Sequence, residues 1–220
     1  MTDIKRARPL LITDCDEVLL HMVSHFGDWV RDVKGFDFDP EGADFSNTLK
    51  DRATGRALAR EDVWPLLDGF FETEMHRQTL VPGAREALAV LSEQADIVVL
   101  TNLTDKFNEA RAIQLEGHGI AHRVVTNQGG KGDPVARLVA EFAPSVTVFV
   151  DDLAHHHTSV AKHAPDVWRL HMIAEPFIAV KTPSAVDAHA RIDDWGDAVE
   201  WIEGRFAGRA DELKVSLTQS

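Results

Sequence analysis

Two aspartates separated by one residue stand directly after an apolar run near the start of the chain. Asp14 and Asp16 follow Leu10–Thr13, which is typical of a buried strand. In an extended segment, residues two apart point the same way, so both carboxylates are expected to face one site. One carboxylate can attack an electrophile, while the other protonates the leaving group and then activates water. For this pair alone, two solvated aspartates in a turn are the ordinary alternative.

A hydroxyl, an amide and a lysine stand at two later positions of the same kind. Thr101 and Asn102 follow the apolar run Ile97–Leu100, and both side chains can donate hydrogen bonds to phosphate oxygens. Capping of the next helix is the alternative role for these two residues. Lys131 lies in a glycine-rich loop before a predicted helix, where it can reach a phosphate and a carboxylate together. An exposed loop lysine is the alternative there.

A second pair of carboxylates, Asp151 and Asp152, follows the apolar run Val146–Val150. Adjacent carboxylates at a strand end indicate a bound cation or a helix cap. Anions that face a phosphate repel it, so a phosphate site lined by aspartates requires a divalent cation. These residues therefore predict a metal-assisted reaction on an anionic substrate.

The net charge of the chain, −13, argues against binding to nucleic acids or to anionic membranes. An anionic substrate must then be attracted locally, by a metal ion, a lysine or backbone N–H groups at helix N-termini. No run of about eighteen apolar residues is present, and the N-terminus has no signal-peptide pattern. The single cysteine, Cys15, fits a reducing compartment. The sequence thus predicts a cytoplasmic protein.

The elements that must bring these strand ends together follow a regular order. Short apolar runs alternate with amphipathic segments, which is typical of strand–helix units around a parallel sheet, and such sheets bind ligands at the carboxyl ends of their strands. The predicted strands are Leu10–Thr13, Ile97–Leu100, Arg123–Thr126, Val146–Val150 and Val167–His171. Helices are expected at Ala84–Gln94, after the caps Thr104 and Asp133, and from Trp195 to Phe206. We predict a three-layer α/β core with a Rossmann-like parallel sheet.

A long segment between Val18 and Pro82 interrupts this order. Apolar residues keep a helical period from Leu19 to Val33, where Gly35 ends the run, and again from Val63 to Met75. A polar, glycine-containing stretch lies between the two runs. Because structureless loops of such length are uncommon, we expect an inserted helical cap. The predicted division is a core of residues 1–17 and 83–207, a cap of residues 18–82, and a polar tail of residues 208–220.

The ordered set of four strand ends resembles the haloacid dehalogenase-like superfamily. The resemblance covers about residues 9 to 160 and leaves the insert unmatched. Each motif is weak by itself, but the ordered set is specific. The matching motifs, in chain order, are Asp14-Cys15-Asp16-Glu17-Val18, Thr101-Asn102, Lys131 and Asp151-Asp152.

The resemblance implies a catalytic or substrate-binding role for five of these residues. Asp14 is expected to form an aspartyl-phosphate, with Asp16 as the general acid and base. Thr101 and Asn102 are expected to bind the phosphoryl group. Lys131 is expected to hold both the nucleophile and the phosphate.

The resemblance also implies a magnesium site. Its ligands are expected to be Asp14, the backbone carbonyl of Asp16, and Asp152, with Asp151 as a ligand or close helper. The insert leaves the core directly after the first motif, as does a helical cap that closes over the site and selects the substrate.

The function predicted in this way is magnesium-dependent hydrolysis of a small phosphorylated metabolite by a monomer or homodimer. A dehalogenase is disfavoured, because that branch does not need a second aspartate such as Asp16. A phosphomutase keeps the same motifs, so the sequence does not separate it from a phosphatase. A non-catalytic phospholigand-binding or scaffold protein is the alternative from another class.

Two residues depart from the superfamily pattern. Glu17 stands where many members have glycine, and a bulky anion there can narrow or repel the substrate entrance. His156 stands where many members have an acidic or amide residue behind the metal site, so metal affinity can be weaker or pH-sensitive. His155, His156 and His157 are not expected to form a metal site, because consecutive residues of a helix point about 100° apart.

Overall fold

One sheet of parallel strands forms the centre of the molecule. The computed structural model describes residues 7–39 and 48–208. Its six-stranded sheet has the order β5-β4-β1-β6-β7-β8. The strands are β1 (Leu10–Thr13), β4 (Asp96–Thr101), β5 (Arg123–Thr126), β6 (Thr147–Asp151), β7 (Trp168–His171) and β8 (Ala190–Arg191). The predicted α/β class is confirmed, while the two-residue edge strand β8 was not predicted.

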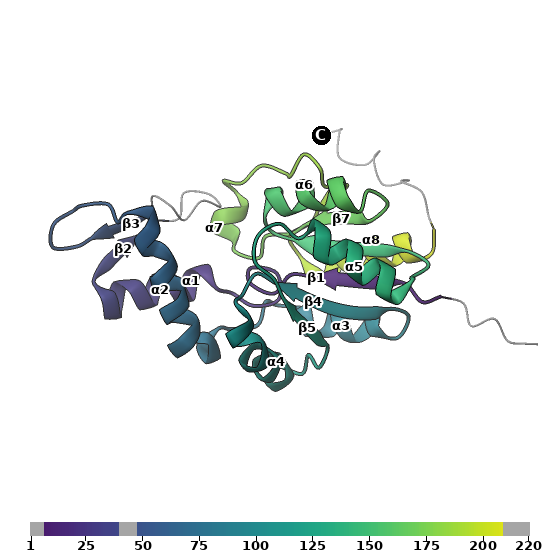
Figure 1. Ribbon diagram of the computed structural model, residues 1–220, viewed down its shortest axis with the longest axis horizontal. Helices are drawn as coiled ribbons and strands as arrows, with labels where there is room; N and C mark the ends of the chain where they lie inside the picture. Colours follow the sequence, from purple (N-terminus) through teal and green to yellow (C-terminus); the bar gives the residue numbers. More distant parts are fainter. Residues whose placement is uncertain (1–6, 40–47, 209–220) are drawn as a thin grey trace, which may run out of the picture.

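Helices cover both faces of this sheet (Figure 1). The helices are α3 (Ala84–Ser92), α4 (Asn108–Gly117) and α8 (Trp195–Phe206) on one face, and α5 (Gly132–Phe142) and α6 (Ala154–His163) on the other. Successive side chains of β1 alternate between the two cores, with Leu11 in the first and Leu10 and Ile12 in the second. Burial on both faces explains the continuous apolar runs of the central strands.

The helix starts differ from the predicted caps. Lys131 itself occupies the N-cap of α5 with a helical backbone, so Asp133 lies inside the first turn and does not cap the helix. Thr104 also makes no capping hydrogen bond; a short 3₁₀ turn, η4 (Asp105–Phe107), precedes α4. Gly132 permits a close approach of α5 to α6, because a Cβ atom there would lie 2.3 Å from the carbonyl oxygen of Ser159.

The insert lies at one end of the molecule, beside the sheet (Figure 1). It contains α1 (Val23–Trp29), the π-helical turn η1 (Val30–Lys34), β2 (Phe36–Phe38), β3 (Leu49–Asp51), α2 (Arg60–Thr73) and the 3₁₀ turn η3 (Met75–Arg77). The helical run ends at Gly35 with a φ of 75°, as its sequence predicts. The antiparallel pair β2–β3 was not predicted within the polar stretch. Part of that stretch, residues 40–47, lies outside the described residues.

The insert has a hydrophobic core of its own. Phe26, Trp29 and Phe70 are buried together, with Phe26 and Phe70 in an edge-to-face contact of 5.6 Å between ring centroids. The start of α1 packs elsewhere: Val23 contacts Ile178 of the short helix α7 (Pro176–Ala179) on the sheet side. The division of the chain into a core of residues 1–17 and 83–207 and a cap of residues 18–82 remains a prediction.

The final helix contacts the loop that follows β1. Trp195, the first residue of α8, is fully buried, and its Nε1 donates a hydrogen bond of 2.8 Å to the carbonyl oxygen of Val18. Within residues 7–39 and 48–208, no helix is long and apolar enough to span a membrane. The predicted tail after Gly208 lies outside the described residues.

Candidate active site

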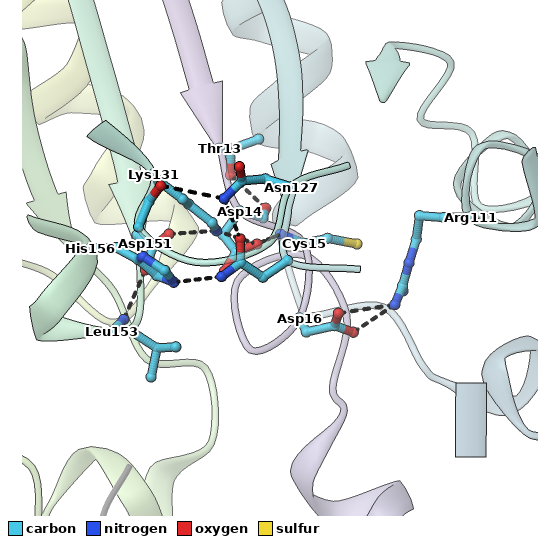
Figure 2. Close-up of polar contacts among 12 residues, drawn as sticks. Thr13, Asp14, Cys15, Asp16, Arg111, Asn127, Lys131, Asp151, Leu153 and His156 are labelled. Atoms are coloured by element: carbon cyan, nitrogen blue, oxygen red, sulfur yellow. Dashed lines mark hydrogen bonds and ion pairs between the residues drawn. The ribbon is translucent and has the colours of Figure 1, made fainter. Parts of the chain in front are cut away.

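A buried lysine links the two carboxylates at the ends of β1 and β6. Lys131 has no exposed surface, and its Nζ lies 2.8 Å from Asp14 Oδ1 and 2.7 Å from Asp151 Oδ2. The remaining donors to these carboxylates are backbone groups: Cys15 N–H to Asp14 Oδ1 and Leu153 N–H to Asp151 Oδ1. Figure 2 shows Asp14, Lys131 and Asp151 converging at the ends of these neighbouring strands.

The charges of this group set the pKa of each member. Burial raises the pKa of Asp14 to about 7, because the attraction of Lys131 only partly offsets the loss of hydration. Burial is also the largest single effect on Asp151, but the charge and hydrogen bond of Lys131, with contributions from His156 and His157, together outweigh it, so the pKa of Asp151 is lowered. The pKa of Lys131 is raised, since both carboxylates outweigh its own burial. The lysine is therefore a permanent cation between two acids of unequal strength.

Asp152 adds a third carboxylate to the same place. One oxygen each of Asp14, Asp151 and Asp152 lie within 4.8 Å of one another. Burial and then the charges of Asp151 and Asp14 raise the pKa of Asp152 well above its usual value. One lysine does not neutralise three carboxylates, so the cluster favours a bound cation. Oxygen ligands at this spacing suit Mg2+, which binds carboxylates at about 2.0–2.1 Å.

Thr101 and Asn102 end β4 next to β1, but they differ in what they can offer. The Thr101 hydroxyl is buried and has no hydrogen-bond partner within the described residues. The Asn102 amide donates to the Gly129 carbonyl at 2.9 Å and lies 3.2 Å from His156 Nε2, while its oxygen accepts from Asn127 at 2.9 Å. Asn102 thus helps to position the glycine-rich loop that carries Lys131, whereas the Thr101 hydroxyl can still donate a hydrogen bond.

Asp16 does not share the site of Asp14. Its two carboxylate oxygens each lie 2.9 Å from Nη2 of Arg111, and Gln78 Nε2 donates to Oδ1 at 2.7 Å. Figure 2 shows Asp16 turned toward Arg111 and away from Asp14. The expectation that both aspartates point the same way was wrong for this conformation. It assumed an extended segment, whereas the chain turns at Cys15, whose carbonyl oxygen accepts hydrogen bonds from the N–H groups of Val18, Leu19 and Leu20.

Glu17 explains how a side chain replaces glycine at this turn. Its Oε1 accepts hydrogen bonds from the backbone N–H groups of Met22 and Val23, at 2.7 Å and 2.6 Å. These bonds fix the first turn of α1 and offset the strain of a left-handed backbone at Glu17, whose φ is 61°. Glu17 therefore points toward the insert and is buried, so it does not narrow the substrate entrance as its sequence position suggested.

The histidines near the site are uncharged and form hydrogen bonds with neighbouring groups of the site. Burial lowers the pKa of His156 to about 3, and His157 Nε2 lies 3.0 Å from the carbonyl oxygen of Asp151. On β7, His171 accepts from Ala185 N–H at Nδ1, so its Nε2–H donates to the carbonyl oxygen of Asp152 at 2.7 Å. Within the described residues, His155, His156 and His157 are not among the side chains that lie close enough together to share a metal ion.

Comparisons with known proteins complete the description. No family model matches the sequence, and no curated protein matches it. A haloacid dehalogenase-like family hydrolase of Streptococcus pneumoniae has 9% sequence identity and a TM-score of 0.63, with 89% of this chain and 99% of that chain covered. The chain has the haloacid dehalogenase-like fold. A magnesium-bound hydrolase of this superfamily from Bacillus subtilis has 14% identity and a TM-score of 0.60, with 90% and 99% covered.

A third structure with the haloacid dehalogenase-like fold is a candidate phosphoglycolate phosphatase of Lactobacillus plantarum. It has 14% identity and a TM-score of 0.59, with 88% of this chain and 99% of that chain covered. Coverage near the full length of each neighbour means that the likeness includes the insert as well as the sheet.

Sequence reasoning missed Arg111 and Gln78, the two partners of Asp16. A signal for Arg111 was present: Phe107, Arg111 and Leu115 are spaced by four residues, and all three are buried. A charged residue on an apolar stripe indicates a buried partner. Gln78, just before the return to the core, carries no comparable pattern.

Proposed function

We propose that the protein is a magnesium-dependent phosphomonoesterase that forms an aspartyl-phosphate on Asp14. The observation that carries this proposal is Lys131, buried between Asp14 and Asp151 with Asp152 beside them. A permanent cation in contact with a nucleophile and close to a metal-ligand set is suited to a phosphoryl group, which needs charge neutralisation from several sides. The fold supports a hydrolase, since the neighbours described above carry that name.

Asp14 has one oxygen available for attack. Oδ1 is engaged by Lys131 and Cys15 N–H, whereas Oδ2 has no hydrogen bond from the described residues. In the first step a carboxylate oxygen of Asp14 bonds to phosphorus, and the ester oxygen leaves with a proton. Water then attacks the aspartyl-phosphate, releases inorganic phosphate and restores the carboxylate. Lys131 balances the negative charge of both states without moving a proton.

Asp16 is the proposed source and acceptor of the proton. To reach the ester oxygen, its carboxylate must leave Arg111 and Gln78. Figure 2 shows Arg111 on the side of Asp16 that faces away from Asp14. We propose that this exchange accompanies substrate binding, because a nearby phosphate offers new partners. Thr101, with its free hydroxyl, is the proposed donor to a phosphoryl oxygen, and Asn102 the residue that positions the loop of Lys131.

The residues proposed to hold Mg2+ are Asp14, Asp152 and the carbonyl group of Asp16, with Asp151 beside them. Their donor atoms are all oxygens, and the pKa values of Asp14 and Asp152 are raised by burial and also by the charges of neighbouring carboxylates, which a cation would neutralise. When bound, the metal supplies charge neutralisation and orientation for the phosphoryl group. The hydrolase from Bacillus subtilis described as bound to magnesium supports this assignment.

The insert is proposed to select a small phosphorylated metabolite. It leaves the core directly after Asp16, and Gln78 at its return contacts the Asp16 carboxylate, so both of its connections touch the site. A cap that moves at these two connections would cover the phosphoryl group and exclude water. Candidate substrate ligands within the insert include Arg52 and Arg77, which are exposed and paired with Asp37 and Glu74.

The test is release of inorganic phosphate from a panel of phosphorylated metabolites and a small aryl phosphate, with Mg2+ and with excess chelator. We expect turnover with Mg2+ only, and its loss in Asp14→Asn. Asp133→Asn is the matched control, because Asp133 is an exposed aspartate on α5, outside the cluster. Turnover that is equal in chelator, or a folded Asp14→Asn variant with normal rates, would contradict the proposal. Binding of phosphate esters without turnover would indicate a ligand-binding protein instead.

A further inference from the structure

A second group of metal-ligating side chains lies at the base of the insert. Glu17, His21 and Glu175 each offer one ligand atom, and these atoms lie within 4.8 Å of one another. Their side chains come from three segments: the turn after β1, the approach to α1, and the N-cap of α7. None of the three has a role in the phosphoryl chemistry proposed above.

Glu17 has one oxygen that no protein group satisfies. Oε1 accepts two short backbone hydrogen bonds at the start of α1, whereas Oε2 is buried and has no partner within the described residues. Only 2% of the residue is exposed. A buried carboxylate oxygen without a donor is strongly unfavourable, so its burial needs a cation that satisfies it.

His21 and Glu175 complete the group but do not satisfy Glu17. His21 Nδ1 lies 3.2 Å from Glu175 Oε1, and this nitrogen forms no hydrogen bond of good geometry. An ordinary ion pair between these two residues would account for their proximity. Such an ion pair would leave Glu17 Oε2 without a partner beside the Glu175 carboxylate. It therefore does not explain why the Glu17 carboxylate is buried there.

We propose that Glu17, His21 and Glu175 bind a zinc ion through Oε2, Nδ1 and a carboxylate oxygen respectively. One imidazole nitrogen and two carboxylate oxygens form a ligand set that zinc accepts, and three protein ligands leave one tetrahedral position for water. Magnesium prefers a set of oxygens only, as in the Asp14 cluster. The two sites therefore differ in the metal that each selects.

The position of this site gives the ion a structural effect. The Glu17 carbonyl accepts a hydrogen bond of 2.9 Å from Ala174 N–H, so the turn after β1 already adjoins the segment that carries Glu175. A bound zinc ion would link both segments to His21, which lies just before α1. The base of the insert would then be fixed to the sheet next to the nucleophile loop, without contact with the substrate.

The test is titration of the metal-free full-length protein with Zn2+, followed by calorimetry, and with Co2+, followed by its visible absorption, in excess Mg2+. We expect one equivalent to bind and to raise the melting temperature. His21→Gln, Glu175→Gln and Glu17→Gln should each weaken binding at least tenfold. The matched controls are His76→Gln and Glu200→Gln, which change exposed residues away from the group, and Asp152→Asn, which changes only the magnesium cluster.

Binding that is unchanged in the three cluster variants, or lost equally in the controls, would overturn the proposal. Absence of Zn2+ and Co2+ binding to the wild-type protein would also overturn it. If Glu17→Gln does not fold, because its hydrogen bonds to α1 are weakened, His21→Gln and Glu175→Gln decide the question. Their melting temperatures in chelator establish whether the folded state is retained.

Discussion

The Nη2 atom of Arg111 lies 2.9 Å from each carboxylate oxygen of Asp16, and the guanidinium group that carries it has no exposed surface. Asp16, the residue proposed to transfer the proton, is thus held by a buried cation that lies on its side facing away from Asp14. The structure describes a resting arrangement, in which Asp14 is held by Lys131 and Asp16 by Arg111. The proposed proton transfer by Asp16 requires the second pair to separate.

Removing Arg111 should destabilise the fold. Arg111→Met leaves Asp16, whose side chain is 16% exposed, without its cation. Breaking a buried pair in this way costs about 2–4 kcal/mol of unfolding free energy, somewhat reduced here because Asp16 can regain water. Urea unfolding at neutral pH measures the loss. Arg85→Met is the control: Arg85 also pairs with an acid, but both side chains are exposed, and its loss should be negligible. Equal losses of unfolding free energy for the two variants would show that the Arg111–Asp16 pair contributes no more to stability than an exposed ion pair.

The two aspartates should differ in their effects on turnover. Asp14→Asn removes the nucleophile and should lower the rate on the order of 10³-fold or more. Asp16→Asn should still form phosphoenzyme from an aryl phosphate, whose leaving group needs little protonation. Rapid-quench detection of a phosphoprotein that is stable in acid and labile in base separates the two cases. Because Asp16→Asn also leaves Arg111 with a neutral partner, its stability must be measured first. Phosphoenzyme in Asp14→Asn would assign the nucleophile elsewhere.

Magnesium affinity should fall as the pH falls below about 7. The pKa of Asp14 in the metal-free protein is raised to about 7, so above that pH this carboxylate is ionised and the metal displaces no proton from it. Below it, each proton displaced weakens the apparent affinity by up to about tenfold per pH unit. Calorimetry at pH 8 and pH 6, in buffers of different ionisation enthalpy, counts the protons released. An affinity that is independent of pH, with no proton released, would contradict the raised pKa.

Gly132 should tolerate no side chain. In Gly132→Ala the new Cβ would meet the Ser159 carbonyl oxygen at 2.3 Å, which forces α5 away from α6 and moves the adjacent Lys131. Overpacking of this kind costs about 1–3 kcal/mol, and kcat should fall with it. Gly204→Ala is the control within α8, where nothing lies within 4 Å of the new Cβ. That change should stabilise the protein by about 0.5–1 kcal/mol. Thermal unfolding of both variants gives the comparison.

The sequence predicted the sheet better than it predicted the loops. Leu10–Thr13 and Arg123–Thr126 have the predicted bounds. For Leu10–Thr13 the reason is that an apolar run of this length is buried on both faces of a parallel sheet. Convergence of Asp14, Lys131 and Asp151 also follows, since the carboxyl ends of neighbouring parallel strands lie at one edge. These features depend on regular periodicity, which a single sequence displays.

The orientation of Asp16 could not be predicted, because it depends on a turn at Cys15 and on partners far along the chain. No local sequence pattern marks the hydrogen bonds from Val18, Leu19 and Leu20 N–H to the Cys15 carbonyl oxygen. Arg111 is separated from Asp16 by 95 positions. The hairpin β2–β3 was missed for a different reason: each strand has only three residues, too few to show alternation.

The hydrogen bond from Trp195 to the Val18 carbonyl has a consequence for the order in which the molecule is made. These residues are 177 positions apart, and the bond supports the turn that carries Asp14 and Asp16. During synthesis, the proposed nucleophile Asp14 emerges from the ribosome before α8, so this support for its loop arrives only when α8 has been translated. A nascent chain that ends before α8 would carry all four motifs but lack the Trp195 hydrogen bond that supports the motif with Asp14 and Asp16. Competence for phosphoryl capture should therefore appear late on the ribosome, as a single event coupled to docking of the last helix.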